Sequence, residues 1–369
     1  MKKLYQFICS LFLLIPLSAH AESNNKINFF GYVDGSYNYL YRSNLFTSGT
    51  HNRVYDLEQN GLTLQQIYLL LDKLPDQGLG GGLNIIIGRD ANEISPAGLN
   101  PNVFDIQNIG LTVAQAYLQY SYQSFTLKAG EMLSLAGLEQ NNYADDTNFS
   151  RSILDGYAQS GIHVGLRATK KFNQQISFIA GVNNGWNSIR QPGRLNTIEF
   201  GINYIPCHIL SLTIDGSSGQ QYLTDNTFTG PTGVRNLLDI FGTLTITDQL
   251  NLAMNYDYGV QSKALLPNAD IKRTTWQGFA GYLNYLFNDK WRTSFRSEIF
   301  SDSDGYRTGV RQNWREITLT LGYLPIKKLE FRGEIRRDFS NVNSFLDTNR
   351  INTANTQQSY ALNVLYQFA

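Results

Sequence analysis

The chain has 369 residues, with 30 Lys plus Arg against 30 Asp plus Glu. This neutral balance gives no reason to expect nucleic acid as a partner. Two cysteines exclude a disulfide-stabilised scaffold, and a mean hydropathy of −0.27 argues against a helical membrane protein.

The N-terminus has the pattern of a cleavable secretory signal. Lys2 and Lys3 form a basic start, an apolar stretch is centred on residues 11–17, and Ala19-His20-Ala21 gives a small-residue end. A membrane anchor is the alternative, but the apolar core is short. We therefore expect residues 1–21 to be removed, so that an exported mature chain begins at Glu22 and forms a single domain over residues 22–369.

The mature chain alternates apolar and polar residues with a period of two, which predicts strands with one apolar face. In the last segment the apolar face carries Tyr360, Leu362, Val364, Tyr366 and Phe368. No comparable helical period is present. Sixteen such segments begin near residues 27, 62, 81, 111, 124, 161, 175, 195, 208, 236, 249, 275, 291, 315, 328 and 357.

The connections between these segments alternate between short and long, which is typical of an antiparallel meander whose two ends face different environments. Short turns are expected at residues 121–124, 170–173, 206–207, 247–248, 288–290 and 325–327. Long polar connections are expected at residues 42–61, 90–110, 136–160, 218–235, 261–274, 301–314 and 339–356.

The second face of the strands is polar and charged, and aromatic residues gather near strand ends. A soluble sandwich or propeller would instead bury a second apolar layer. An apolar band between two aromatic girdles suits a lipid-facing wall, and a sheet in hydrocarbon must close because unpaired edges are too costly. We predict an all-β fold: a closed antiparallel transmembrane β-barrel of about 16 strands, with 14 or 18 as alternatives, short periplasmic turns and long extracellular loops.

Several segments resemble the OmpL-like outer-membrane β-barrel porin family. They include FFGYVDGSYNY at residues 29–39, AQAYLQYSYQSFTLKAGEMLSLAG at 114–137 and TIEFGINYIP at 197–206, within a likeness over roughly residues 27–216. The resemblance implies the outer membrane of a Gram-negative cell and a channel role. It also implies outer-membrane lipid, lipopolysaccharide and the barrel assembly machinery as partners, with Tyr366 and Phe368 as the assembly signal. Ala369 after Phe368 departs from the usual aromatic end.

In a porin, the charges that face the lumen set which solutes pass. The alternation predicts an acidic wall facing a mixed, arginine-bearing wall, which would orient dipolar or zwitterionic solutes. The alternative is that these charges only satisfy one another on a wet surface. The predicted pore-lining residues are Glu199, Asp215, Asp239 and Asp257 on the acidic wall, Arg292, Arg296, Glu298, Glu316, Glu330, Arg332, Glu334 and Arg336 on the mixed wall, and Arg167 and Lys128 on earlier strands.

The 136–160 connection is the candidate constriction loop. It carries Glu139, Asp145, Asp146 and Arg151, and it could either fold into the lumen or screen the outer mouth. The glycine cluster at residues 78–82 is expected to be a flexible turn and not a phosphate cradle, because no helix follows it.

No motif for catalysis, a metal or a cofactor is found. We therefore expect a porin that is not an enzyme and that passes small hydrophilic solutes by diffusion, with a homotrimer as one assembly. The first alternative is a non-conducting surface barrel whose loops bind ligands, and the second is a barrel enzyme that uses His163. Cys207, alone after signal cleavage, is expected to be an inert free thiol.

Overall fold

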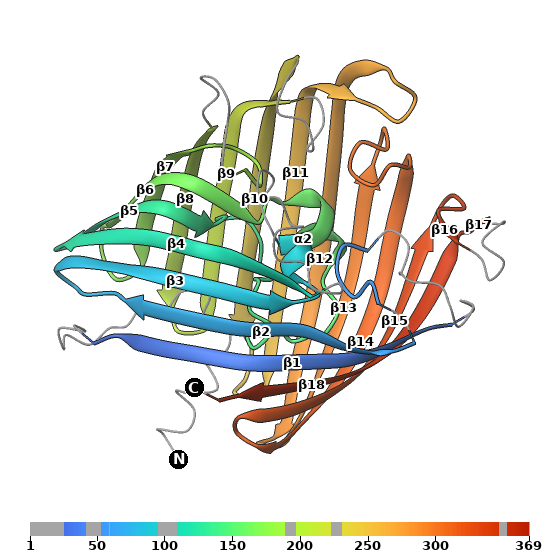
Figure 1. Cartoon of the computed structure of the whole chain (residues 1–369), viewed down its shortest axis with the longest axis horizontal. Coiled ribbons are helices and arrows are strands. Elements are labelled where there is room, and N and C mark those ends of the chain that lie inside the picture. The colour runs from blue at the N-terminus through green and yellow to red at the C-terminus, as the bar shows by residue number, and fades with distance from the viewer. Residues whose placement is uncertain are drawn as a thin grey trace.

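A computed structural model describes residues 26–41, 53–58, 60–94, 109–188, 197–222, 231–346 and 353–368. Sixteen antiparallel strands close into one barrel (Figure 1). They are β1 (Asn28–Tyr41), β2 (Leu62–Lys73), β3 (Gly78–Gly88), β4 (Gly110–Tyr122), β5 (Phe125–Leu133), β6 (Ile162–Lys171), β7 (Ile176–Asn183), β8 (Thr197–Cys207), β9 (Leu210–Tyr222), β10 (Thr232–Thr245), β11 (Leu250–Leu265), β12 (Ile271–Asn288), β13 (Trp291–Asp302), β14 (Gln312–Ile326), β15 (Leu329–Ser340) and β18 (Thr356–Gln367).

The barrel closes where the first strand meets the last. β1 pairs with β18 from Tyr32↔Gln367 to Tyr41↔Gln358, so the blue and dark red strands are neighbours at the bottom of Figure 1. Every wall strand thereby has a hydrogen-bonded partner on both sides, as a wall in hydrocarbon requires. The predicted closed antiparallel barrel and its strand number are confirmed.

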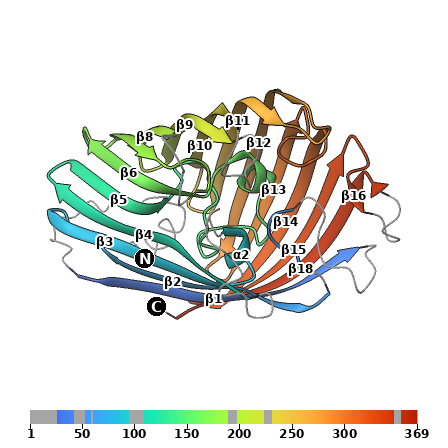
Figure 2. The ribbon, with the colours of Figure 1, turned by 45° about the horizontal axis from the view of Figure 1, so that its top comes forward.

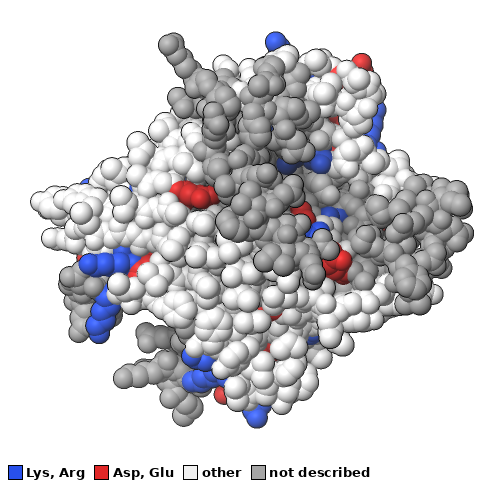
Figure 3. All heavy atoms as spheres, viewed as in Figure 1, with Lys and Arg blue, Asp and Glu red and all other residues white. Residues whose placement is uncertain are grey.

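Alternating side chains give the wall two different faces. On β14, Ile317, Leu319 and Leu321 are 46 to 50% exposed on the outside. The residues that alternate with them, Glu316, Thr318 and Thr320, are fully buried inside. This is the pattern of a barrel with lipid outside and a polar interior. In Figure 3, the outer surface over β1 to β4 is largely uncharged, and charged side chains gather toward its left and lower edges.

The predicted start of each wall strand lies within four residues of the observed one. The expectation of a flexible turn at residues 78–82 is wrong, because these glycines begin β3. A Cβ on Gly81 would lie 2.6 Å from the Tyr117 carbonyl oxygen, and one on Gly82 would lie 2.8 Å from the Tyr117 ring. The run of glycines therefore allows β3 and β4 to approach closely.

In the described parts of the long connections, three short elements are present. They are a helix α2 (Ala91–Ile94), a single π-helical turn η2 (Leu154–Ala158), and a hairpin of β16 (Phe345–Leu346) with β17 (Thr353–Ala354). Of the helical segments in the described ranges, none has the length and apolarity to cross a bilayer. Figure 2 shows α2 and the connection that carries η2 inside the ring of strands.

Candidate functional site: the barrel lumen

The connection between β5 and β6, residues 134–161, lies inside the barrel, and we call it the lumenal loop. Phe149 and Leu154 of this loop are at most 1% exposed. Leu154 belongs to an apolar cluster with Trp276, Phe300 and Trp314 of the wall. The loop is therefore packed on the inner wall rather than extended into solvent.

Two wall carboxylates hold the middle of the lumenal loop by its backbone. Glu334 accepts hydrogen bonds from the amides of Phe149 (2.7 Å) and Ser150 (3.0 Å). Glu298 accepts from the amides of Ile153 (2.9 Å) and Leu154 (3.2 Å) at the start of η2. The first amides of a helical turn have no partner within it and carry partial positive charge, so a carboxylate there is favourable.

Arginines of the mixed wall complete the attachment by donating to backbone carbonyls of the lumenal loop. Such charge-assisted hydrogen bonds are stronger than neutral ones, so these contacts fix the loop to strands β13 and β15. The contacts are Arg296 Nη1 to Ser150 O (2.6 Å), Arg336 Nη1 to Arg151 O (2.6 Å), Arg332 Nη2 to Tyr143 O (3.0 Å) and Arg292 Nη1 to Thr147 O (2.8 Å).

Arg296 is the centre of the ion pairs on this wall. It lies 2.8 Å from both Glu316 of β14 and Glu139 of the lumenal loop, and 3.3 Å from Glu298 of its own strand. Its side chain is fully buried. A buried charge that loses its partner is costly, so Arg296 and the three carboxylates stabilise one another. Arg292 and Arg332 similarly share Glu330 at 2.6 and 2.9 Å.

Asp215, Asp239 and Asp257 form a row across β9, β10 and β11. Asp239 is the register partner of both others, and all three are at most 2% exposed. The lumenal loop covers the row: the Gly137 amide donates to Asp239 (2.7 Å) and the Gln159 side chain to Asp257 (2.8 Å). The acidic row and the arginine-bearing wall are therefore bridged by the loop.

The other predicted wall charges lie apart from this bridge. Glu199 is paired with Arg167 at 2.6 Å. The Lys128 ammonium lies 4.3 Å from the centre of the Tyr117 ring, a distance at which the cation interacts with the ring face.

The predicted loop charges tie the lumenal loop to itself. Arg151 forms a buried ion pair with Asp146 and lies over the Tyr143 ring at 4.5 Å. The Asn142 side chain donates to Asp145 (2.7 Å). Glu139 accepts from the Ser152 amide (2.7 Å) and so connects the two ends of the loop's central part.

Burial and the arginines shift the pKa values of the loop carboxyls in opposite directions. Burial raises the pKa of Asp155 to about 7, although Arg151 counteracts it. Burial likewise raises the pKa of Asp145 to about 6. For Glu139, burial acts upward, but the guanidiniums of Arg296 and Arg151 outweigh it, and the pKa falls below its usual value.

Arg53, which is not among the predicted pore-lining residues, enters the barrel from the long connection before β2. Its guanidinium lies 2.6 Å from Asp338 of β15 and 2.6 Å from Asp56. Asp338 follows Arg336 by two residues on β15, so the same apolar–polar alternation that predicts Arg336 in the lumen also predicts Asp338 there. Nothing in the local pattern around Arg53 shows that it would reach this strand.

His163, the residue of the enzyme alternative, lies beside Ser160 with 3.2 Å between Nε2 and Oγ. Both residues are at most 4% exposed, and the other ring nitrogen lies 3.1 Å from the Gly185 carbonyl oxygen. The pair is therefore closed to solvent. Within the described ranges, no group of three or more His, Cys, Asp or Glu residues is arranged to hold a metal ion.

The predicted assembly signal lies at the end of β18 and is exposed on the outer wall. Tyr366 and Phe368 are 46% and 39% exposed. The Phe368 amide donates to the Gly31 carbonyl (3.0 Å), and the Phe368 ring lies 6.3 Å from that of Phe29. Ala369 and the predicted signal peptide lie outside the described residues.

A closed barrel with an apolar outer wall, a charged inner wall and a loop held across its interior defines the class of β-barrel outer-membrane channels. The chain belongs to the family described as "Putative beta-barrel porin-2, OmpL-like", whose model matches residues 26–368. The resemblance to OmpL-like porins is thus confirmed and extends over the second half. The protein is accordingly an outer-membrane porin.

Several solved structures of channels, porins and outer-membrane proteins have the same fold. The channel DcaP of Acinetobacter baumannii has a TM-score of 0.65 at 13% identity, covering 93% of this chain and 97% of DcaP. An anion-selective porin from Comamonas acidovorans has a TM-score of 0.65 at 10% identity, covering 93% and 99%. OmpT of Vibrio cholerae in its trimer form has a TM-score of 0.58 at 9% identity, with the same coverage of 93% and 99%. Curated protein sequences gave no match.

Proposed function

We propose that the barrel passes small hydrophilic solutes by diffusion and that the lumenal loop narrows the passage. The observation that carries this proposal is the attachment of one loop to two walls of the lumen. Arg296 and Arg336 hold the Ser150–Arg151 segment, and Asp239 holds Gly137 on the other wall. A loop that is bound to both walls cannot move freely in the lumen. It therefore narrows the cross-section of the lumen by a constant amount.

Purified protein in a planar bilayer tests this proposal. We expect stepwise ohmic conductance, and swelling of proteoliposomes in small sugars but not in large ones. A folded barrel that stays silent in both assays would instead support the non-conducting surface barrel whose loops bind ligands.

We also propose that the acidic row contributes to ion selectivity through its field, even though the lumenal loop covers it. Changing Asp215, Asp239 and Asp257 together to Asn should shift the reversal potential in a salt gradient toward anion preference. The control changes three exposed acids of the short turns, Asp76, Asp248 and Asp289, to Asn. An equal shift in the control, or none in the first variant, would show that the row does not act on passing ions.

The fold and family are those of a channel, and we infer that the chain has no catalytic role and needs no cofactor. The buried Ser160–His163 pair supports this inference, since a substrate could not reach it. A hydrolytic activity that is lost in His163→Ala would overturn it.

We propose a homotrimer in contact with lipopolysaccharide. The trimer form of the similar OmpT supports the assembly. Arg315 of β14 and Arg337 of β15 are exposed on the outer wall near the long-loop end, where anionic lipid headgroups would offset their charge. Light scattering of the detergent-solubilised protein should give three times the monomer mass. Arg315→Gln with Arg337→Gln should reduce the lipopolysaccharide that co-purifies.

A further inference from the structure

A cavity of about 520 Å³ lies where several long connections meet over the lumenal loop. Its volume falls within the range of small-molecule sites in proteins. The walls come from the segment before β2, from α2, from the lumenal loop, from the end of β11, and from the connections after β7 and β13. The cavity therefore lies on the route by which a solute would approach the lumenal loop from the long-loop side.

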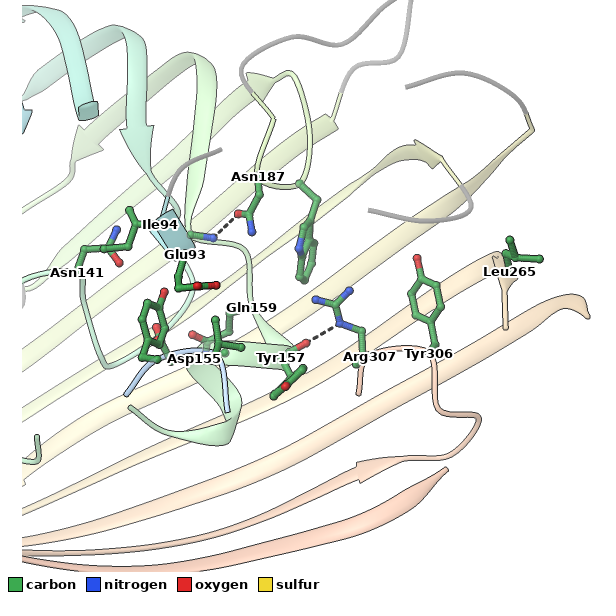
Figure 4. Close-up of a pocket in the computed structure, with 15 residues that line it drawn as sticks. Glu93, Ile94, Asn141, Asp155, Tyr157, Gln159, Asn187, Leu265, Tyr306 and Arg307 are labelled. Carbon is green, nitrogen blue, oxygen red and sulfur yellow. Dashed lines mark hydrogen bonds between the residues drawn. The ribbon is translucent and has the colours of Figure 1, made fainter. Parts of the chain in front are cut away.

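The cavity has acidic residues at one end and a basic residue at the other. Figure 4 shows Glu93 and Asp155 on one side, Tyr306 and Arg307 on the other, and Tyr157 between them. Tyr55 and Trp186 add aromatic surface to the lining. Opposite charges at two ends of an aromatic cavity suit a molecule that carries both charges and an apolar body.

The acidic end contains an acceptor without a donor. The Oδ2 atom of Asp155 is buried and has no hydrogen-bond partner among the described residues. Leaving a buried acceptor unpaired costs stability. Glu93 adds a second carboxylate, one oxygen of which lies 3.0 Å from Arg89. The Asp155 side chain is partly exposed and lines the cavity, so a ligand with a primary ammonium group would place a donor at this incompletely paired carboxyl group.

The basic end is held rigidly. Arg307 Nε donates to the Tyr157 carbonyl (2.6 Å), and the guanidinium lies over the rings of Trp186 (5.0 Å) and Trp276 (5.4 Å). Stacked arginines are preorganised for planar anions, and a carboxylate is the anion that matches their geometry.

We propose that this cavity binds a short peptide with free ends, its ammonium at Asp155 and its carboxylate at Arg307. A dicarboxylate would meet Asp155 and Glu93 with like charge, and a diamine would meet Arg307. A neutral sugar would leave both charged ends without a counter-charge. In a single amino acid both charges are attached to one carbon atom, whereas each added residue moves the two ends of a peptide apart by about 3.5 Å. A short peptide can therefore place its charges on the two sides of Tyr157.

This inference rests on the proposed diffusion function, because it makes the peptide a solute that binds before it passes. The test uses the full-length protein in a planar bilayer, with tryptophan fluorescence of the detergent-solubilised protein as a second measure. The probe is glycyl-L-phenylalanine, added on the long-loop side. The matched probes are N-acetyl-glycyl-L-phenylalanine, which lacks the ammonium, and glycyl-L-phenylalaninamide, which lacks the carboxylate. Phenylalanine and glucose complete the set.

We expect the free dipeptide to interrupt the current and to bind at least about tenfold more tightly than either blocked form, because each blocked form loses one charge-assisted contact. Asp155→Asn should abolish the difference between the free and the acetylated dipeptide. This change keeps the shape of the side chain and removes a charge whose burial is unfavourable, so the variant should fold. Asp304→Asn, an acid that pairs with Lys272 outside the cavity, is the control and should keep the difference.

Equal binding of the free and blocked dipeptides, or of glucose, would overturn the site. Loss of the difference in the Asp304→Asn control would also overturn the assignment to Asp155. A channel that conducts but ignores the dipeptide refutes the site and leaves the porin proposal intact. A silent barrel whose tryptophan fluorescence still reports selective dipeptide binding supports the site and refutes the proposed diffusion.

Discussion

At the scale of residues, Arg296 connects the charges of wall strands β13 and β14 to the lumenal loop through ion pairs and hydrogen bonds of its own guanidinium. It is fully buried, pairs with Glu139 and Glu316, and donates to the Ser150 carbonyl. Replacing it by Met removes the cation that lies 2.8 Å from each of these carboxylates. We expect Arg296→Met to lower the free energy of unfolding by about 3–5 kcal/mol, as measured by guanidinium unfolding followed by tryptophan fluorescence.

The matched control for this prediction is Arg315→Met. Arg315 lies on neighbouring β14 but points outward and is exposed, so its removal should change the free energy of unfolding little or even raise it. Equal losses in the two variants would mean that the buried ion pairs do not stabilise the barrel.

The ionisation of Asp155 should make dipeptide binding depend on pH. Burial raises its pKa to about 7 in the folded protein, so folding is increasingly penalised as the pH rises from about 4 to about 7 and the carboxylate charges. A peptide ammonium binds the charged form. Dipeptide binding should therefore strengthen by up to about eightfold from pH 6 to pH 7.5, since the ionised fraction grows from roughly one tenth to three quarters.

Titration calorimetry across this pH range measures the effect, because the peptide amino group, with a pKa of about 8, stays mostly protonated. Asp155→Asn should show a flat profile. A wild-type profile that is also flat, or that falls with rising pH, would remove Asp155 from the binding site.

At the scale of elements, the strands could be predicted from the sequence and the path of the lumenal loop could not. β14 faces lipid on one side and a polar interior on the other, so apolar and polar residues alternate along it. This alternation can be recognised within a segment of about ten residues. The loop is held instead by partners far along the chain, as Ser150 is held by Arg296, 146 residues away. Local sequence around Ser150 shows a long polar connection but not the surface that it contacts.

The β3 glycines show a second limit of local sequence. A glycine run between two strands usually indicates a turn, but here the backbone of β4 approaches Gly81 and the Tyr117 ring approaches Gly82. The requirement for small residues comes from the neighbouring strand, and a single sequence carries no direct sign of it.

Shortening the lumenal loop tests its role as an element. Residues 139–158 take no part in the pairing of β5 with β4 or β6, so replacing them by a short Gly-Ser linker should leave a folded barrel. We expect a larger single-channel conductance and entry of larger sugars, because the bridge between the walls is gone. The control shortens the β11–β12 turn at residues 266–270, and conductance should then stay unchanged.

At the scale of the whole molecule, Cys207 reports which end of the barrel faces the periplasm. It lies exposed at the end of β8, next to the short turn that leads to β9. A maleimide on a polyethylene glycol too large for the lumen should modify Cys207 only after the outer membrane is permeabilised. Asp304→Cys in a Cys207→Ser background should react in intact cells, since Asp304 lies on a long loop. The reverse pattern would mean that the barrel is oriented with its short turns outside.

The first wall strand, β1, is hydrogen-bonded to the last one, β18, so the strands form a closed ring. The Phe368 amide already binds the Gly31 carbonyl across the junction, so a short peptide could join the two ends. The chain could then be reopened at another short turn, such as the one between Asn288 and Trp291. Every strand of the wall would keep its two neighbours, but a different strand would be the C-terminal one. Comparing the two proteins would separate the residues required for stability of the folded barrel from those required for its assembly.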